Sequence, residues 1–270
     1  MYLRSLIFSL TLLFCATPLL ANSDDYRKAQ SLVEQSTFIV QDFNVDPNYP
    51  WMQEKLKIAK AILVIPQSLR GGFIFGGSGG TGVLLARNDD GTWSNPAFYT
   101  LASVSVGLQI GADASQIVLL IMTEKGMNSL LATSFKLGAD VSVAAGPVGG
   151  GARAATTDVF AYSKAKGLFG GAAIEGAVVT VRDSLNSAYY KKPVTPVDII
   201  VRKNVANPES DVFRHTIAEL ARIPADAPPT VVDPFITKVE TERQTLTLPM
   251  PHNTPQTIPA PTDGGEQVFQ

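Results

Sequence analysis

The chain has 270 residues, with 22 basic and 24 acidic side chains and a formal net charge of −2 at neutral pH. This mildly acidic balance argues against nucleic acid as a partner, because nucleic-acid-binding domains generally carry a basic excess. Two histidines and one cysteine are too few for a structural zinc site, and no metal or cofactor is predicted.

The first 21 residues predict a secretory signal peptide that is not part of the fold. Arg4 supplies a positive start, and residues 6–13 form an apolar core that is shorter than the roughly 20 residues of a membrane span. Such a signal peptide would direct the chain to the periplasm or envelope of a Gram-negative bacterium and would be cleaved after Ala21. Two alternatives are an uncleaved anchor and a lipoprotein acylated at Cys15, although the residues before that cysteine fit a lipobox poorly.

Two helices are predicted before the first strand. Residues 24–43 place apolar side chains at the i, i+3, i+4, i+7 spacing of an amphipathic helix. This helix is expected either to pack on a sheet or to lie in a membrane interface. A turn at residues 44–50 leads to a short second helix, with Lys57 and Lys60 on the side opposite its apolar face.

A glycine-rich sheet is predicted for the middle of the chain, where 20 of the 22 glycines lie between Gly71 and Gly176. Glycine within strands marks bulges, bends and close backbone approach. The expected fold is therefore α+β and β-rich, with a curved antiparallel sheet or partial barrel flanked by N- and C-terminal helices. Strands are predicted at residues 61–65, 73–75, 83–86, 97–100, 103–110, 117–122, 135–145, 157–166 and 171–181.

Helix signals return towards the C-terminus. Thr195 and Asp198 have the spacing of a capping box, and Asn207 precedes a proline at the start of another predicted helix. Residues 224–270 hold 9 of the 18 prolines and little periodicity, which predicts an extended or disordered tail. The predicted organisation is a signal peptide at 1–21, a domain at 22–223 and a proline-rich tail at 224–270.

Short stretches of the sequence match catalytic or cofactor-binding motifs, but the secondary structure predicted around them does not fit those motifs. Residues 76–80 match G-x-S-x-G around Ser78, yet the nucleophile elbow needs a helix after the serine, and residues 81–85 look like a strand. The same context argues against a dinucleotide fingerprint at residues 77–82. His215 lies four residues after Asp211 on a predicted helix, so a surface pair explains it. The chain is therefore expected not to be an enzyme.

An ordered series of motifs gives a family resemblance between about Trp51 and Leu220. The series resembles the SYLF family, which includes yeast actin-binding endocytic proteins, animal SH3-containing adaptors and exported bacterial homologues. The resemblance implies a lipid-binding module; eukaryotic members bind phosphoinositides with the help of an amphipathic helix, matched here by residues 24–43 or 52–60. The motifs are Trp93–Phe98, Gly107–Ala112, Met122–Gly126, Leu137–Asp140, Ala144–Gly149, Tyr162–Phe169 and Glu175–Ala177.

The resemblance implies affinity for anionic lipid or another amphiphile. The predicted export, and the lack of a recognisable SH3 domain, argue against an actin partner and against phosphoinositides. The expected function is binding of anionic headgroups through a local basic patch and an amphipathic helix; the alternative is a structural or protein-interaction module that uses the proline-rich tail. The candidate headgroup contacts are Lys55, Lys57, Lys60, Arg70, Lys164, Lys166, Lys191 and Lys192.

Overall fold

The computed structural model of the protein describes residues 17–72, 75–106, 111–145, 157–165, 174 and 176–222. The chain divides into two compact units, residues 1–228 and 229–270. The second unit, and with it the predicted proline-rich tail, lies outside the described residues. Residues 1–16 of the predicted signal peptide also lie outside them, so the predicted domain limits and the export of the chain stay predictions.

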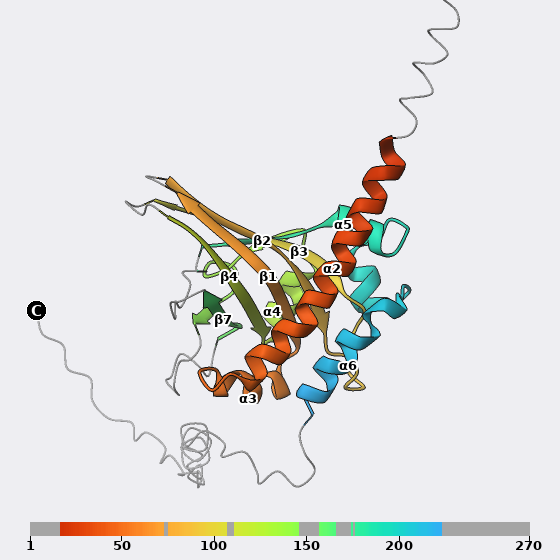
Figure 1. Ribbon diagram of the computed structural model, residues 1–270. Helices are drawn as coiled ribbons and strands as arrows, with labels where there is room; N and C mark the ends of the chain where they lie inside the picture. Colours follow the sequence, from red (N-terminus) through yellow and green to blue (C-terminus); the bar gives the residue numbers. More distant parts are fainter. Residues whose placement is uncertain are drawn as a thin grey trace, which may run out of the picture. The chain divides into compact units, whose positions relative to one another are not determined.

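The centre of the domain is an eight-stranded, mostly antiparallel sheet that curves into a half-barrel (Figure 1). Its spatial order is β5-β8-β3-β2-β1-β4-β7-β6, and the β6–β7 pair is parallel. This confirms the predicted fold class. The strands are β1 (Ala61–Gly72), β2 (Phe75–Ala86), β3 (Ala97–Val106), β4 (Gly111–Ile121), β5 (Ser134–Lys136), β6 (Val143–Ala145), β7 (Val159–Ala165) and β8 (Val178–Val181).

The long central strands correct three predicted breaks. Strand β1 continues through Pro66 to Gly72, and β2 includes the whole glycine run at residues 76–80. The predicted strands at 97–100 and 103–110 join as β3. A shift of register between Val64 and Gln67 forms a β-bulge, which accommodates a proline that has no N–H to donate. Pairing on both sides holds the glycines in the ladder although they have low strand propensity.

This bulge brings the backbone of β1 against the inner side of β2. A Cβ atom at Gly80 would lie 2.4 Å from the carbonyl oxygen of Gln67 and 2.7 Å from Cγ2 of Ile65. A Cβ atom at Gly82 would lie 2.7 Å from both the Ile65 side chain and a backbone oxygen of β1. Glycine is therefore needed at these two positions because the two strands approach too closely for a side chain.

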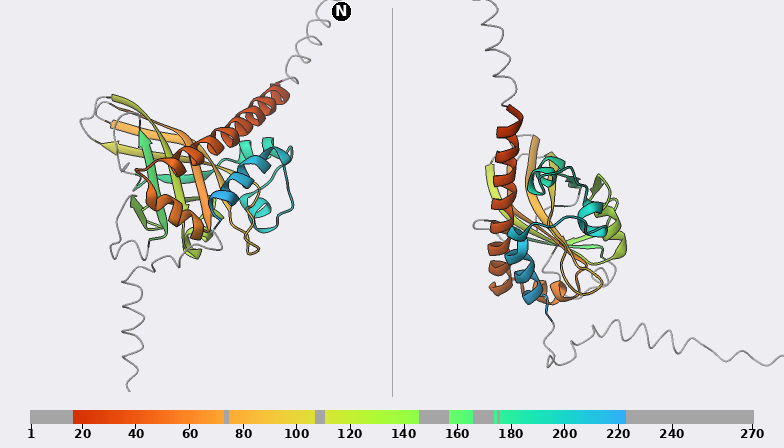
Figure 2. Two further views of the ribbon diagram at one scale, coloured as in Figure 1. Left: turned by 60° about the horizontal axis from the view of Figure 1, so that its bottom comes forward. Right: turned by 90° about the vertical axis from the view of Figure 1, so that its right-hand side faces the viewer.

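Helices cover one end of the sheet's outer face. Helix α2 packs beside α5 and α6, which come from the C-terminal part of the domain, and also contacts β1 and β2 (Figure 2). Helix α4 lies on the inner side, where the Tyr99 hydroxyl donates to the Leu130 carbonyl at 2.6 Å. The helices are α2 (Thr17–Val45), α3 (Pro50–Ile58), α4 (Glu124–Leu130), α5 (Asp183–Tyr189) and α6 (Asp211–Leu220), with shorter turns at Val197–Val201 and Pro208–Ser210.

The apolar face of α2 packs into the core of the domain. Val33, Val40 and Phe43 on that face are at most 2% exposed. Nearer its start, Tyr26 stacks on Tyr189 of α5 with ring centroids 6.1 Å apart. Of the two roles left open for this helix, packing on the sheet is the one adopted in the structure. The helix begins at Thr17, earlier than the predicted start.

Short polar side chains cap two of the helical segments, and one of these caps is the predicted pair of Thr195 and Asp198. The Thr123 side chain accepts a hydrogen bond from the backbone N–H of Gly126 at 3.1 Å and begins α4. Thr195 and Asp198 bond reciprocally, each backbone N–H donating to the other's side chain at 3.0 and 3.3 Å. This second cap begins only a single π-helical turn at residues 197–201, in place of a longer helix.

A buried carboxylate joins three elements at one edge of the half-barrel. Asp158, just before β7, accepts hydrogen bonds from the Thr123 hydroxyl at 2.5 Å and from the Ser142 N–H and hydroxyl at 2.9 Å each. Lys125 lies 3.7 Å away. Burial raises the pKa of Asp158, but these hydrogen bonds and the lysine outweigh burial and hold the pKa below its ordinary value.

Candidate functional site

The predicted basic residues do not form one patch. Lys60 precedes β1 and Arg70 lies near its far end, roughly 30 Å away at about 3.3 Å per strand residue. Lys164 is on β7, and Lys166 lies outside the described residues. The other candidates are on α3, which carries Lys55 and Lys57, and after α5, where Lys191 and Lys192 follow.

Lys164 serves as a link between α2 and the sheet. Its Nζ lies 2.7 Å from Asp42 Oδ2 and 2.8 Å from Asp46 Oδ2, at the C-terminal end of the helix. The hydrogen bond from Lys164 is the main reason that the pKa of Asp46 falls to about 2. Two carboxylates already surround this cation, so an anionic headgroup would have to displace them to bind it.

Three more of the predicted lysines contact protein groups, and two do not. Lys57 and Lys192 form no ion pair within the described part of the chain. Lys192 is exposed and is an ordinary solvated side chain, whereas Lys57 is half-buried. The three contacts are Lys60 Nζ with Glu124 Oε1 at 2.6 Å, Lys55 Nζ over the Phe160 ring at 5.1 Å, and Lys191 Nζ over the Tyr26 ring at 5.2 Å.

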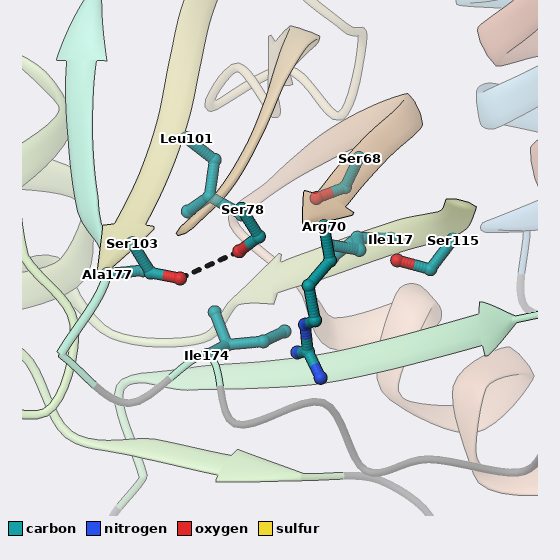
Figure 3. Close-up of a pocket in the computed structure, with 9 residues that line it drawn as sticks. All are labelled: Ser68, Arg70, Ser78, Leu101, Ser103, Ser115, Ile117, Ile174 and Ala177. Carbon is teal, nitrogen blue, oxygen red and sulfur yellow. Dashed lines mark hydrogen bonds between the residues drawn. The ribbon is translucent and has the colours of Figure 1, made fainter. Parts of the chain in front are cut away.

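Arg70 differs from the lysines because it lines a small hollow on the inner side of the sheet (Figure 3). Four serines on four adjacent strands line the same hollow: Ser68 on β1, Ser78 on β2, Ser103 on β3 and Ser115 on β4. Ser68 lies opposite Ser115 in the ladder, and Ser78 lies opposite both Arg70 and Ser103. Cross-strand pairing therefore gathers one guanidinium and four hydroxyls.

Most polar groups of this hollow have no protein partner. Ser78 and Ser103 hydrogen-bond each other, with their Oγ atoms 2.7 Å apart. Among the described residues, the Ser68 and Ser115 hydroxyls and the Arg70 guanidinium form no hydrogen bond or ion pair, although Ser68 is only 3% exposed. These groups are left available to a ligand.

The wall of the hollow is apolar. Leu101, Ile117, Ile174 and Ala177 complete its lining, and all four are buried. Guanidinium and hydroxyl donors suit the oxygens of a phosphate or carboxylate, and the wall suits an adjoining apolar group. The hollow itself has room for about one water molecule, so an anionic group would contact these donors from the exposed side of Arg70.

The geometry gives no support to nucleophilic catalysis at Ser78. Strand β2 runs straight through Ser78, so the helix that an elbow requires is not there. Its hydroxyl bonds a serine instead of a base, and His215 is on the exposed side of α6. The predicted Asp211–His215 pair is replaced by an ion pair between Asp211 and Arg214 at 3.0 Å.

The described residues offer neither a metal site nor a membrane span. No cluster of three or more histidine, cysteine, aspartate or glutamate side chains in this part of the chain could hold a metal ion. Its helices include none with both the length and the apolar character of a membrane span.

Sequence reasoning named Arg70 as one of eight candidate cations and considered Ser78 only as a nucleophile, so it missed the serines as a group around Arg70. A serine in a strand is a weak signal by itself, because strands often expose one polar face. The useful signal is that Ser68 and Arg70 alternate on β1 and so share a face. Bringing Ser78, Ser103 and Ser115 beside them requires the register of four strands, which the sequence pattern does not fix.

Comparison with known proteins finds a family model and several relatives that are similar to part of the chain. Residues 102–220 match the family model described as "Ysc84: Las17-binding protein actin regulator". The chain is 36% identical over 164 residues to "Protein YSC84" of Saccharomyces cerevisiae, which covers 58% of this chain and 35% of that protein. It is 31% identical over 150 residues to human "SH3 domain-containing YSC84-like protein 1", which covers 53% of this chain and 44% of that protein.

A second yeast relative gives the same result. "LAS seventeen-binding protein 3" of S. cerevisiae is 36% identical over 172 residues, or 61% of this chain and 37% of that protein. The chain thus spans less than half the length of these relatives. No solved structure matches the chain.

Proposed function

Because the chain contains a domain of the Ysc84/SYLF family, we propose that it is a non-enzymatic module that binds anionic lipid headgroups at a membrane surface. One observation carries this proposal: the Arg70 guanidinium, without an ion pair among the described residues, shares an apolar-walled hollow with four serine hydroxyls. This site replaces the dispersed lysines as the preferred headgroup contact.

The donors at the exposed side of the hollow suit the oxygens of a single phosphate group. The guanidinium can donate two parallel hydrogen bonds to phosphate oxygens, and Ser68 and Ser115 can donate further ones. Asp113 lies opposite Arg70 in the ladder and is exposed, without forming an ion pair with it. Its negative charge would oppose an incoming anion, so Asp113 sets a limit on affinity that a neutral variant would lift.

Arg70→Gln is expected to weaken binding to phosphatidylglycerol–phosphatidylcholine vesicles about tenfold, because charged hydrogen bonds are worth about 1.5–3 kcal/mol. Asp113→Asn should strengthen the same binding a few-fold. Co-sedimentation across a salt series measures both effects, and binding should fade as salt rises. Lys192→Gln is the matched control, because it removes one exposed charge outside the hollow.

Two results would count against the headgroup site. Equal losses of vesicle binding for Arg70→Gln and Lys192→Gln would mean that binding depends on the overall charge of the protein and not on the hollow. No sedimentation with anionic vesicles at low salt would overturn the proposed function itself.

A second candidate is a protein-interaction module, because the matched family model is described as a Las17-binding actin regulator. The predicted proline-rich tail, residues 224–270, is the segment proposed to carry such an interaction. Deleting it should abolish capture of a protein partner while the melting temperature of the domain is unchanged. Unchanged capture by the truncated chain would exclude the tail as the contact.

We also propose that the chain is exported, on the basis of Arg4, the apolar residues 6–13 and Ala21. The lipid surface would then be that of a bacterial envelope, and an actin partner would be out of reach. Fractionation of cells that express the full chain, compared with a chain lacking residues 1–21, tests this location. Equal amounts of both in the cytoplasm would disprove export.

A further inference from the structure

Helices cover one end of the outer face of the sheet, and the side chains at the other end of this face are exposed. Along β3, alternate residues Phe98, Ala102 and Val104 point to this face. Phe98 is buried against Tyr189 of α5, with ring centroids 5.1 Å apart, whereas Ala102 is exposed and Val104 is 92% exposed. The helix layer therefore ends partway along the strand, and the strands continue beyond α2 in Figure 1.

The bare region forms an apolar surface across three adjacent strands. Leu69 on β1 is 57% exposed and lies opposite Gly79 on β2, which lies opposite Ala102 on β3; Val104 lies opposite Gly77 in the next row. We call Leu69, Gly77, Gly79, Ala102 and Val104 the apolar flare. Within the described residues, no side chain covers it.

The apolar flare and the Arg70 hollow are the two faces of the same strand segments. Leu69 lies between Ser68 and Arg70 in sequence, and Ser103 lies between Ala102 and Val104. Because side chains alternate across a strand, the apolar group points out where the polar groups point in. This end of the sheet is thus a single layer of strands with an apolar side and an anion-binding side.

A bilayer interface offers matching surroundings on both sides. Acyl chains accept exposed valine and leucine side chains, and phosphates lie at the level where a guanidinium binds them. The two helical segments expected to contact lipid are α2 and α3. Both have their apolar side chains in the core, with Val40 on α2 and Leu56 on α3 fully buried. The apolar flare lies beside Arg70, whose guanidinium forms no ion pair within the described residues.

We propose that the apolar flare enters the interface of an anionic bilayer, with Leu69 and Val104 on the acyl side and Arg70 at the level of the phosphates. This inference rests on the proposed function and adds to it the part of the molecule that touches the membrane. It assigns the contact to the end of β1–β3 and not to α2 or the lysine clusters.

A fluorescent probe at Val104 tests the contact directly. In a full-length Cys15→Ser background, Val104→Cys would be labelled with nitrobenzoxadiazole and mixed with equimolar phosphatidylglycerol–phosphatidylcholine vesicles. Its emission should shift to the blue and be quenched by lipids that carry a spin label on the acyl chain. The matched control is Val212→Cys on α6, which is 70% exposed and should not respond.

Charged substitutions give a second readout without a label. Leu69→Glu and Val104→Glu should each weaken vesicle binding about tenfold, from lost apolar burial and added repulsion. Val212→Glu adds the same charge at an exposed valine on α6 and should weaken it far less. All three positions are exposed, so circular dichroism and melting temperature should match those of the unsubstituted chain.

The outcomes separate this inference from the proposed function. Vesicle binding with a response at residue 212, and none at Val104, would overturn the inference and keep the proposed function. A Val104 response that depends on protein concentration without vesicles would identify a second copy of the chain as the occupant and overturn the bilayer contact. No vesicle binding by any labelled chain would overturn both.

Discussion

Gly80→Ala is expected to lower the free energy of unfolding by about 3 kcal/mol, because an added methyl group would overlap two neighbours. The new Cβ would lie 2.4 Å from the carbonyl oxygen of Gln67, which is backbone and is paired with Thr81 of β2 in the ladder. It would also lie 2.7 Å from Cγ2 of Ile65, which is fully buried. Neither neighbour can move without disturbing the bulge at Pro66.

Gly71→Ala is the matched control, because a Cβ at Gly71 would have nothing within 4 Å. It should change stability by less than about 1 kcal/mol, with a small gain from the restricted unfolded chain. Urea unfolding of both variants, with the slope compared as well as the midpoint, measures the difference. Similar midpoints for the two would show that β1 and β2 are not as close at Gly80 as the structure has them.

Asp158→Ala is expected to lower the free energy of unfolding by about 3 kcal/mol, because it removes the acceptor of three hydrogen bonds at a buried position. Those bonds connect the N-terminus of α4, the approach to β6 and the start of β7. Glu124→Ala, next to the same helix cap but largely exposed, is the control and should cost less than about 1 kcal/mol. Thermal unfolding of both at neutral pH measures the difference.

The cost of Asp158→Ala should depend on pH in a defined direction. The pKa of Asp158 is depressed in the folded protein, so its stabilising effect is present above the unfolded pKa of about 3.9 and is lost as pH falls through the folded pKa. The difference in unfolding free energy between the unsubstituted chain and the Asp158→Ala variant should therefore become smaller below about pH 4. A difference that stays constant from pH 7 to pH 2 would mean that the ionised carboxylate is not the stabilising group.

Local chemistry made part of the fold predictable from sequence. The spacing of Val33, Val40 and Phe43 gave the buried face of α2, and the Thr195–Asp198 pair gave a cap. Such signals act within one or two helical turns, so they do not depend on where the rest of the chain goes. The curved, glycine-rich sheet followed from composition in the same way.

Long-range pairing explains what the sequence left unpredicted. The continuity of β1 through Pro66 depends on partners on both of its sides. The pairing of Lys164 with Asp42 joins residues 122 positions apart, so the sequence around Lys164 gave no sign that this cation is already paired. The Arg70 hollow needed the same kind of information, because its four serines come from four strands.

The position of α2 between the two ends of the domain has a consequence for synthesis. The Tyr26 hydroxyl donates to Glu209 across 183 residues, and α2 packs on α5 and α6. The part of α2 that packs on α5 and α6 thus stays uncovered until nearly the whole domain has left the ribosome. Folds with such distant contacts form slowly, so α2 is translated early but is among the last elements to be fully buried. The nascent chain therefore presents a natural binding site for a chaperone.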